Sequence, residues 1–418
     1  MINRNHTILF LIFFALCALK IDGMNLLHRP YDTLLIPEIY LDRCFELAFW
    51  AEAGVRPARG YNEHDNLVNP LAIYQCNQDA LAMLNGFPAN SLQTQLRTAL
   101  NATEDGVRGH LCLNGKLNLD FGGAFGARWY FLPHAWITAL LPIYKVDLSD
   151  VTITDLTQNV TAADMRVKQQ LIQNLNTIVG QLGNNLSLAG WKRTGFGDLN
   201  LLCEFLFNFP QERPLLKNVE IDGRCGLTLP TGKRAAEDKL FAFPFGYDGA
   251  VGILFGAGLN VALGDQFIAG FDVQLLHLFG NTRSRRIKTA FDQTDLLLLA
   301  KADAYKDYGL TQRFNLFVQG YRLFGGGLSL LVGYQFLKHG DDHLALDGCE
   351  FSSLIANSAA SLEEWIVHSV EFNLNYDFAR HCPDSWAAPQ ASLFARLPFS
   401  GKRSVAFTTV GVMLAVDF

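Results

Sequence analysis

The sequence lacks long apolar runs. Its 418 residues are 50% hydrophobic and only 18% charged, with a mean hydropathy of +0.13, which is high for a secreted soluble protein. The run from Ile8 to Leu19 has about twelve residues, fewer than the roughly 18 that a transmembrane helix needs. The most apolar internal run, Leu296 to Ala300, is shorter still. The sequence therefore excludes a membrane protein that spans the bilayer with helices. Its high apolar content nevertheless means that many apolar side chains must be kept away from water.

An excess of positive charge is also lacking. The chain has 34 Lys and Arg residues against 40 Asp and Glu residues, which gives a net charge of -6 and a pI near 5.9. A nucleic-acid-binding surface normally carries an excess of basic residues. We therefore expect no nucleic acid among the partners of this protein.

Cysteine is present, but not in metal-binding patterns. The eight cysteines include no CxxC motif and no Cys/His spacing typical of zinc sites, so no metal and no cofactor is predicted. Loss of Cys17 with an export signal would leave seven, and an odd number requires an unpaired thiol or an intermolecular bond. Two disulfide pairs are candidates: Cys76 with Cys112 in one inter-strand segment, and Cys203 with Cys225 on one face of successive strands.

The first residues have the pattern of a secretory signal. Arg4 precedes the apolar run, and Gly23 is small enough for the last position before a cleavage site. We therefore expect residues 1–23 to be a signal peptide. Residues 24–42 are then a periplasmic N-terminal segment, and 43–418 are the folded domain.

Alternation with a period of two dominates the rest of the chain. In 404–418, residues such as Val412 and Leu414 alternate with smaller or more polar residues, and 199–209 and 366–378 repeat this pattern. A period of two predicts strands whose two faces meet different surroundings. Apolar residues spread over alternate positions, in a chain without helical spans, are typical of a transmembrane β-barrel.

The pattern predicts about twelve strands. Many exceed ten residues, which suits a tilted membrane strand better than the usual strand of a globular protein. The expected strands are 43–54, 116–131, 135–149, 195–209, 216–229, 248–263, 266–279, 311–324, 327–338, 365–379, 388–399 and 404–418.

The connections between these strands alternate between short and long, as expected for turns at one end of a barrel and loops at the other. Helical spacing within 92–100 and 162–182 predicts helices in the long connections. The segment 296–308 is expected in a loop, because counting it as a strand would break this alternation; if it is a strand, a partner strand must lie nearby and the total becomes fourteen. The expected long loops are 55–115, 150–194, 230–247, 280–310 and 339–364.

Two short stretches resemble known outer-membrane barrels. The last strand, ending in Phe418, resembles the closing strand of bacterial outer-membrane β-barrels, in which the terminal aromatic residue is a signal for the barrel-assembly machinery. The Leu-Pro-Thr-Gly stretch at 229–232 is similar to strand ends in porin-like barrels for hydrocarbon and phenol-pathway uptake. The resemblance implies an all-β fold, a transmembrane antiparallel barrel in contact with outer-membrane lipid, and an assembly signal at Phe418.

Charged residues at the inward positions of the strands are candidates for lining the lumen. Acidic side chains outnumber basic ones among them, and acidic rings favour cations in pores. The predicted lumen-lining residues are Glu46, Glu52, Asp120, Arg128, Asp198, Glu204, Glu220, Asp222, Arg224, Asp272, Glu371 and Asp377.

A compact polar cluster lies where one predicted strand meets a loop. It consists of His339, Asp341, Asp342 and His343. An Asp/His pair at a barrel rim can activate water, and two imidazoles with two carboxylates can hold a divalent metal. A solvated loop is the plainer interpretation of the same residues, so no catalytic residue is assigned.

The sequence thus predicts an outer-membrane channel or transporter for small solutes, preferring cations if it conducts. Two alternatives stay open. One is an enzyme with an Asp/His site at the rim, and the other is a structural or adhesive barrel whose long loops bind a partner.

Overall fold

The computed structural model describes residues 33–35, 39, 43–100, 108–158, 160–323, 326–348, 350–381 and 386–418. The expected signal peptide, 1–23, lies outside these residues. Of the expected N-terminal segment 24–42, the described part is Thr33–Leu35 together with Ile39.

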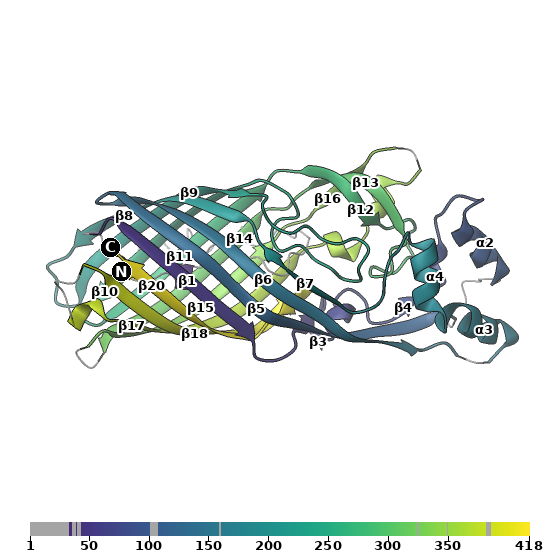
Figure 1. Ribbon diagram of the computed structural model, residues 1–418, viewed down its shortest axis with the longest axis horizontal. Helices are drawn as coiled ribbons and strands as arrows, with labels where there is room; N and C mark the ends of the chain where they lie inside the picture. The colour runs from purple at the N-terminus through teal and green to yellow at the C-terminus, as the bar shows by residue number, and fades with distance from the viewer. Residues whose placement is uncertain are drawn as a thin grey trace, which may run out of the picture.

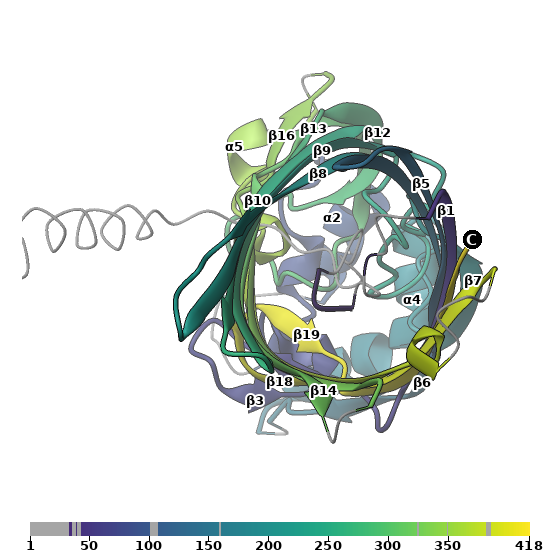
Figure 2. The ribbon, with the colours of Figure 1, turned by 90° about the vertical axis from the view of Figure 1, so that its left-hand side faces the viewer.

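Within the described residues, twelve antiparallel strands close into a single barrel (Figures 1 and 2). Each barrel strand is hydrogen-bonded to the next one along the chain, and the last is paired with the first. Closure satisfies the backbone polar groups of every strand, which a lipid environment requires. The strands are β1 (Phe45–Gly54), β5 (His110–Leu132), β6 (Ala135–Asp155), β8 (Leu199–Pro210), β9 (Leu216–Leu229), β10 (Gly252–Leu263), β11 (Phe267–Leu278), β14 (Thr311–Leu323), β15 (Leu328–His339), β17 (Trp365–Asp377), β18 (Ala388–Lys402) and β20 (Thr409–Asp417).

The seam between β1 and β20 joins the two ends of the barrel. Its register pairs Leu47 with Val416 and Trp50 with Met413. Beyond the ladder, Cys44 donates its N–H to the Phe418 carbonyl at 2.8 Å, and Phe418 donates to the Phe45 carbonyl at 2.7 Å. The start of β1 and the end of β20 therefore lie together at one end of the barrel, which we call the terminal end (Figure 1). The opposite end, with the long connections, is the loop end.

The outer face of the barrel is apolar and uncovered. Leu414 and Val412 on β20 are 56% and 46% exposed. On β8, Phe205 and Phe207 are exposed while the alternating Glu204 is buried in the lumen, as the sequence pattern predicted. Exposed apolar side chains on a closed barrel require lipid around them, so the protein is a transmembrane β-barrel of the outer-membrane type and lies in the bacterial outer membrane.

The segment 296–308 does contain a strand, but that strand does not join the barrel. β13 (Ala300–Asp307) pairs with β12 (Asn281–Ile287) and β16 (His343–Leu346) in a separate sheet at the loop end. The barrel count therefore stays at twelve rather than fourteen. A second small sheet contains β2 (Arg59–Tyr61), β3 (Leu67–Val68) and β19 (Ser404–Ala406).

Two strands continue the barrel wall into a lobe at the loop end. β5 and β6 have 23 and 21 residues, against 9 to 15 in the other barrel strands. The far end of β5 pairs with β4 (Gln78–Asp79), and the middle of β6 pairs with β7 (Trp191–Phe196). Several short helices pack there. They are η3 (Pro70–Ala72), η4 (Ala82–Leu84), α2 (Leu92–Ala99), α3 (Ala162–Val167), the π-helix η5 (Lys168–Ile172) and α4 (Leu175–Leu182), with α5 (Ser353–Ala356) and η6 (Ala360–Leu362) nearer β16.

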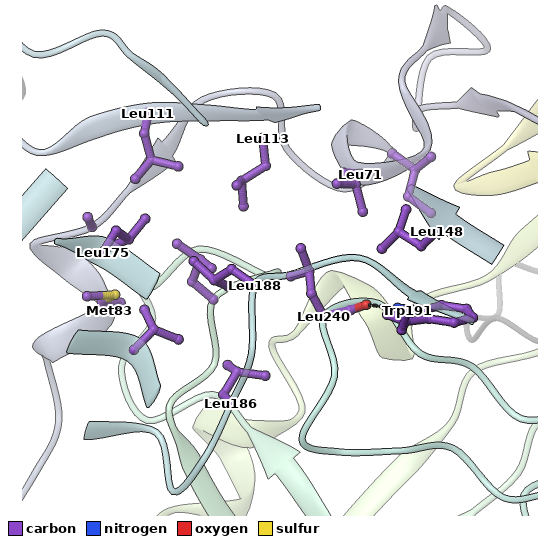
Figure 3. Close-up of a cluster of buried hydrophobic side chains, with 14 of the residues drawn as sticks. Leu71, Met83, Leu111, Leu113, Leu148, Leu175, Leu186, Leu188, Trp191 and Leu240 are labelled. Atoms are coloured by element: carbon purple, nitrogen blue, oxygen red, sulfur yellow. Dashed lines mark hydrogen bonds between the residues drawn. The ribbon is translucent and has the colours of Figure 1, made fainter. Parts of the chain in front are cut away.

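The lobe has its own hydrophobic core. Met83, Leu111, Leu113 and Leu175 come from different parts of the chain and are at most 1% exposed (Figure 3). The indole N–H of Trp191 donates to the Leu240 carbonyl at 2.7 Å, which ties the connection between β9 and β10 to this core. No helix among the described residues is long and apolar enough to cross a membrane.

We predict that a charge on the outer face of β20 destabilises the barrel. Leu414→Arg places a guanidinium in the lipid and should lower the free energy of unfolding by about 2–4 kcal/mol. The matched control is Leu354→Arg, at a 74% exposed leucine of α5 outside the barrel, which should cost less than about 0.5 kcal/mol. Urea unfolding in lipid bilayers measures both. Equal costs would contradict the lipid-facing assignment.

Candidate functional site

The inward faces of the strands carry a layer of buried ion pairs. Arg128 on β5 and Glu46 on β1 are 2.5 Å apart, and the Tyr130 hydroxyl donates to Glu46 at 3.3 Å. On β8, Glu204 accepts hydrogen bonds from the Trp136 indole at 2.9 Å and from the hydroxyl of Thr138. These predicted lumen residues do lie inside the barrel.

Arg224 is the centre of a second group in this layer. Its guanidinium contacts Asp222 on the same strand and lies 2.8 Å from Asp272 on β11. Elsewhere in the lumen, Arg396 on β18 pairs with Glu371 on β17. Arginines inside the barrel thus pair with Glu46, Asp222, Asp272 and Glu371, and Arg224 reaches Asp272 across the intervening strand β10.

The remaining predicted lumen residues lie in varied places. Glu52 lines a small cavity of about 70 Å³ that is bounded by β1, β5, β6 and β18, and Glu220 is half-buried beside Asn218. Asp377, at the end of β17, pairs with Arg380 at 3.0 Å.

Asp198 precedes β8 at the loop end. It accepts hydrogen bonds from the backbone N–H groups of Gly232 at 2.7 Å and Tyr247 at 2.5 Å. Burial raises the pKa of Asp198, and its contacts hold the 230–247 connection onto the barrel.

The prediction for Asp120 is wrong. β5 has an irregular register between Leu119 and Phe121, so Asp120 is the extra residue of a β-bulge. Its carboxylate lies 2.8 Å from Lys192 and 3.6 Å from Lys145, two half-exposed side chains on the outer face. A bulge shifts the alternation by one residue, which strict counting by twos along the sequence cannot reveal.

A short piece of the N-terminal segment, η2 (Thr33–Leu35), lies inside the lumen, where its dark purple trace is visible within the ring of strands in Figure 2. The Thr33 hydroxyl donates to Asp272 at 3.1 Å, and the amide of Asn315 donates to that hydroxyl at 2.6 Å. The Trp50 indole donates to the Leu35 carbonyl at 3.1 Å. Sequence reasoning placed this segment ahead of the barrel and did not anticipate that part of it lies within.

Leu34 packs against Gly333 on the inner side of the wall, where the glycine leaves room for its side chain. It is 1% exposed, and its Cδ1 lies 2.7 Å from the point where a Cβ on Gly333 of β15 would stand. Only glycine at position 333 leaves room for this close approach. The amide of Asn373 also donates to the Leu34 carbonyl at 3.3 Å. The segment is therefore held by apolar packing and by hydrogen bonds from several strands.

Between this polar layer and the loop end, the part of the wall formed by β6, β8, β10 and β11 carries apolar side chains, which we call the apolar layer. Leu140, Leu202, Leu254 and Leu276 come from four barrel strands and are at most 6% exposed. They pack with Tyr247 and the other members of one hydrophobic cluster. A water-filled porin lumen is polar, so this part of the wall differs from the wall of a general diffusion pore.

A cavity of about 270 Å³ lies at the loop end, on the side of the apolar layer that faces away from the ion-paired layer. Tyr74, Tyr247 and Tyr308 contribute phenol rings to its wall, and Arg283 and Arg285 contribute guanidinium groups. This volume is near the lower limit for small-molecule sites. The cavity can therefore hold a small solute with an apolar body and a polar group.

Carboxylates hold the arginines of the cavity in place, and Glu237 is one partner of Arg283. Asp248 contacts Arg283 and lies 2.7 Å from Arg285, and Arg285 also donates to the Tyr308 hydroxyl at 3.3 Å. Burial, together with the neighbouring Arg285, lowers the pKa of Arg283 to about 10. Arg283 therefore remains charged at neutral pH. Sequence reasoning missed these residues because the elements that carry them are far apart in the chain.

Of the polar cluster noted in the sequence, the structure brings His339 and Asp342 into direct contact. His339 and Asp342 are buried and 3.2 Å apart, while Asp341 is half-buried and His343 is exposed on β16. Asp342 also pairs with Lys306 at 2.5 Å and accepts the Gly309 N–H at 3.1 Å. Its oxygens are thus committed to structural contacts.

The other ring nitrogen of His339, Nδ1, contacts the Thr311 hydroxyl at 2.7 Å, and its ring stacks on Trp365. Thr311 is 2% exposed, so the hydroxyl of this hydroxyl–imidazole–carboxylate chain is buried, although His339 and Asp342 also line the cavity at the loop end. Among the described residues, no three His, Cys, Asp or Glu side chains are grouped so that they could hold a metal ion.

Comparisons with known proteins support the fold. No protein-family model matches the sequence, and no curated protein matches it. The structure is similar to that of an outer-membrane channel from Pseudomonas putida F1, with a TM-score of 0.51 and 11% identity over 93% of this chain and 99% of that one. The toluene transporter TbuX of Ralstonia pickettii has 11% identity over 95% of this chain and 96% of its own, with a TM-score of 0.33. Of these two likenesses, only the first supports an argument, and it shows a shared barrel fold.

We predict that the Asp342 contacts give the loop end a pH-dependent stability. Burial alone would raise the pKa of Asp342, but Lys306 and His339 lower it below its ordinary value of 3.8. The contribution is therefore complete above that value and is lost as the pH falls through the folded pKa. Asp342→Asn should lower the free energy of unfolding by about 3–5 kcal/mol at pH 7, with a smaller difference below about pH 3.

Urea unfolding of the wild type and the variant at a series of pH values measures this difference. The control is Asp347→Asn, at an exposed residue, which should change stability by less than about 0.5 kcal/mol. A constant difference between wild type and Asp342→Asn from about pH 7 to pH 3 would rule out the assigned ion pair.

Proposed function

We propose that this protein is an outer-membrane channel that takes up small solutes through a gated lumen. The observation that carries the proposal is the order of layers along the barrel axis. The loop-end cavity opens above an apolar layer, and below it lies the ion-paired layer in which Thr33–Leu35 is inserted. A solute that enters from the loop end meets a binding cavity first and the inserted segment last.

The lining favours a solute with mixed character. Leucines and tyrosines offer an apolar surface, while Arg283 and Arg285 offer N–H donors to a polar group. Such a site combines a mainly apolar wall with a few fixed polar groups, as small-molecule sites usually do. An apolar layer would hinder fully hydrated ions more than it hinders a small amphiphilic molecule.

The direction of transport follows from the orientation of such barrels, which place short turns in the periplasm and long loops outside. The loop end then faces the exterior, and the terminal end faces the periplasm. This orientation agrees with a signal peptide over 1–23 in a Gram-negative bacterium. In this orientation Phe418, whose ring lies 5.5 Å from that of Trp386, would lie at the periplasmic end, which suits the proposed role of its ring as an assembly signal.

We predict that expelling the inserted segment opens the channel. Leu34→Asp would place an unpaired carboxylate against Gly333 and should disfavour insertion by at least about 2 kcal/mol, a population shift of about 30-fold. Single-channel recording in planar bilayers should show a larger mean conductance than that of the wild type. The matched control is Leu92→Asp, at a 64% exposed residue of α2, which should conduct as the wild type does.

If Leu34→Asp folds but conducts no better than the wild type, the inserted segment is not the barrier. A second variant separates this outcome from misfolding. Gly333→Leu fills the space of Leu34 from the wall without changing the segment, and it should raise conductance in the same way.

The cation preference expected from the sequence remains a prediction. Five of the ten predicted lumen acids pair with four arginines, so the excess of negative charge is smaller than a simple count suggested. We expect a modest cation preference that weakens as salt screens the lumen. The reversal potential of Leu34→Asp across a salt gradient measures it, and an anion preference at low salt would contradict it.

A further inference from the structure

Two cysteines meet at the outer part of the loop-end lobe. Cys76 follows Tyr74 in the first long connection, and Cys112 lies near the start of β5. Their Sγ atoms are 3.6 Å apart, close to van der Waals contact and within reach of a bond after a small side-chain rotation. Among the five described cysteines, this is the pair whose sulfur atoms are in direct contact.

The backbone around this pair is already in register. β4 pairs with the first residues of β5, with Gln78 opposite Leu111 and Asp79 opposite His110. The Asn77 amide oxygen also contacts the His110 ring at 2.9 Å. The two chain segments are thus held together independently of the sulfur atoms, so a bond between them would not require the backbone to move far.

We propose that Cys76 and Cys112 form a disulfide in the exported protein, a covalent modification that fastens the first long connection to the barrel wall. The proposal rests on export to the cell envelope, an oxidising compartment. It does not depend on whether the barrel conducts. The closed loop contains the buried core residues Met83 and Leu84, and it holds Tyr74 close to the fastening point.

The chemistry is an ordinary thiol–disulfide exchange with a protein disulfide of the envelope. The thiolate of exposed Cys76 attacks that disulfide, and one sulfur of the oxidant leaves as a thiolate. Cys112 then loses its proton and displaces the second sulfur of the oxidant from Cys76. Two S–H bonds are broken, one S–S bond is formed, and the oxidant becomes a dithiol. Partial burial and the adjacent Cys76 raise the pKa of Cys112, which suits the exposed sulfur for the first attack.

The disulfide would also bear on the cavity. Tyr74 lines the cavity two residues before Cys76, and its ring lies 6.4 Å from that of Phe241, another lining residue. Fastening Cys76 to β5 limits how far Tyr74 can move from this wall. Reduction should therefore loosen the segment 77–111 and leave the barrel strands intact.

Mass spectrometry of the full-length protein from outer membranes tests the proposal. The sample is alkylated without reductant and digested with trypsin, which releases Cys76 in the peptide 60–97 and Cys112 in 109–116. We expect these two peptides to be linked, two hydrogens lighter than their sum, and to separate on reduction. Cys76→Ser should leave Cys112 open to alkylation, and Cys112→Ser should do the same for Cys76.

The matched control is the double variant Cys203→Ser with Cys225→Ser. These residues face each other in register on the outer face of β8 and β9, and their loss should leave the 60–97 to 109–116 link unchanged. Alkylation of both Cys76 and Cys112 in the folded wild type without reductant would overturn the proposal. So would a link from either residue to a different cysteine. A disulfide in a protein that never conducts would support this inference and count against the channel.

Discussion

The ladder between β1 and β20 is the interaction on which the rest of the structure depends. A strand in lipid cannot leave its backbone N–H and C=O groups unpaired, so the sheet must return to its first strand. Here the return is made by nine residue pairs and by further hydrogen bonds through Phe418. The apolar outer face and the polar interior are both consequences, because closure gives every strand one face toward lipid and one toward the lumen.

Most of the barrel could be predicted from the sequence. All twelve barrel strands fall at expected positions, because a dyad pattern of ten or more residues has few competing explanations. Asp120 shows the limit of this reasoning, since one bulge residue reverses the alternation and leaves no signal in composition. β13 shows another limit, because a short strand in a loop has the same local pattern as a wall strand and differs only in its partner.

The candidate site was much harder to foresee. Glu46, Arg128 and Glu204 follow from alternation, but the cavity depends on Tyr74, Asp248 and Arg285, which come from three separate connections. Long-range contacts of this kind depend on the packing of the lobe and have no local sequence pattern. His339 and Asp342 show the converse, since sequence neighbours that looked reactive are buried in structural contacts.

The inserted segment is tethered to the barrel wall, so its effective concentration inside the lumen is high. Leu35 precedes Phe45, the first residue of the wall, by only ten positions. A group on so short a tether has an effective concentration in the lumen of about millimolar or higher, however dilute the protein is. Thr33–Leu35 therefore behaves as an intramolecular ligand, and its effective concentration in the lumen does not fall when the protein is diluted. In the channel that we propose, a solute would compete with this segment locally, and weak contacts would be sufficient to keep the lumen occupied between passages.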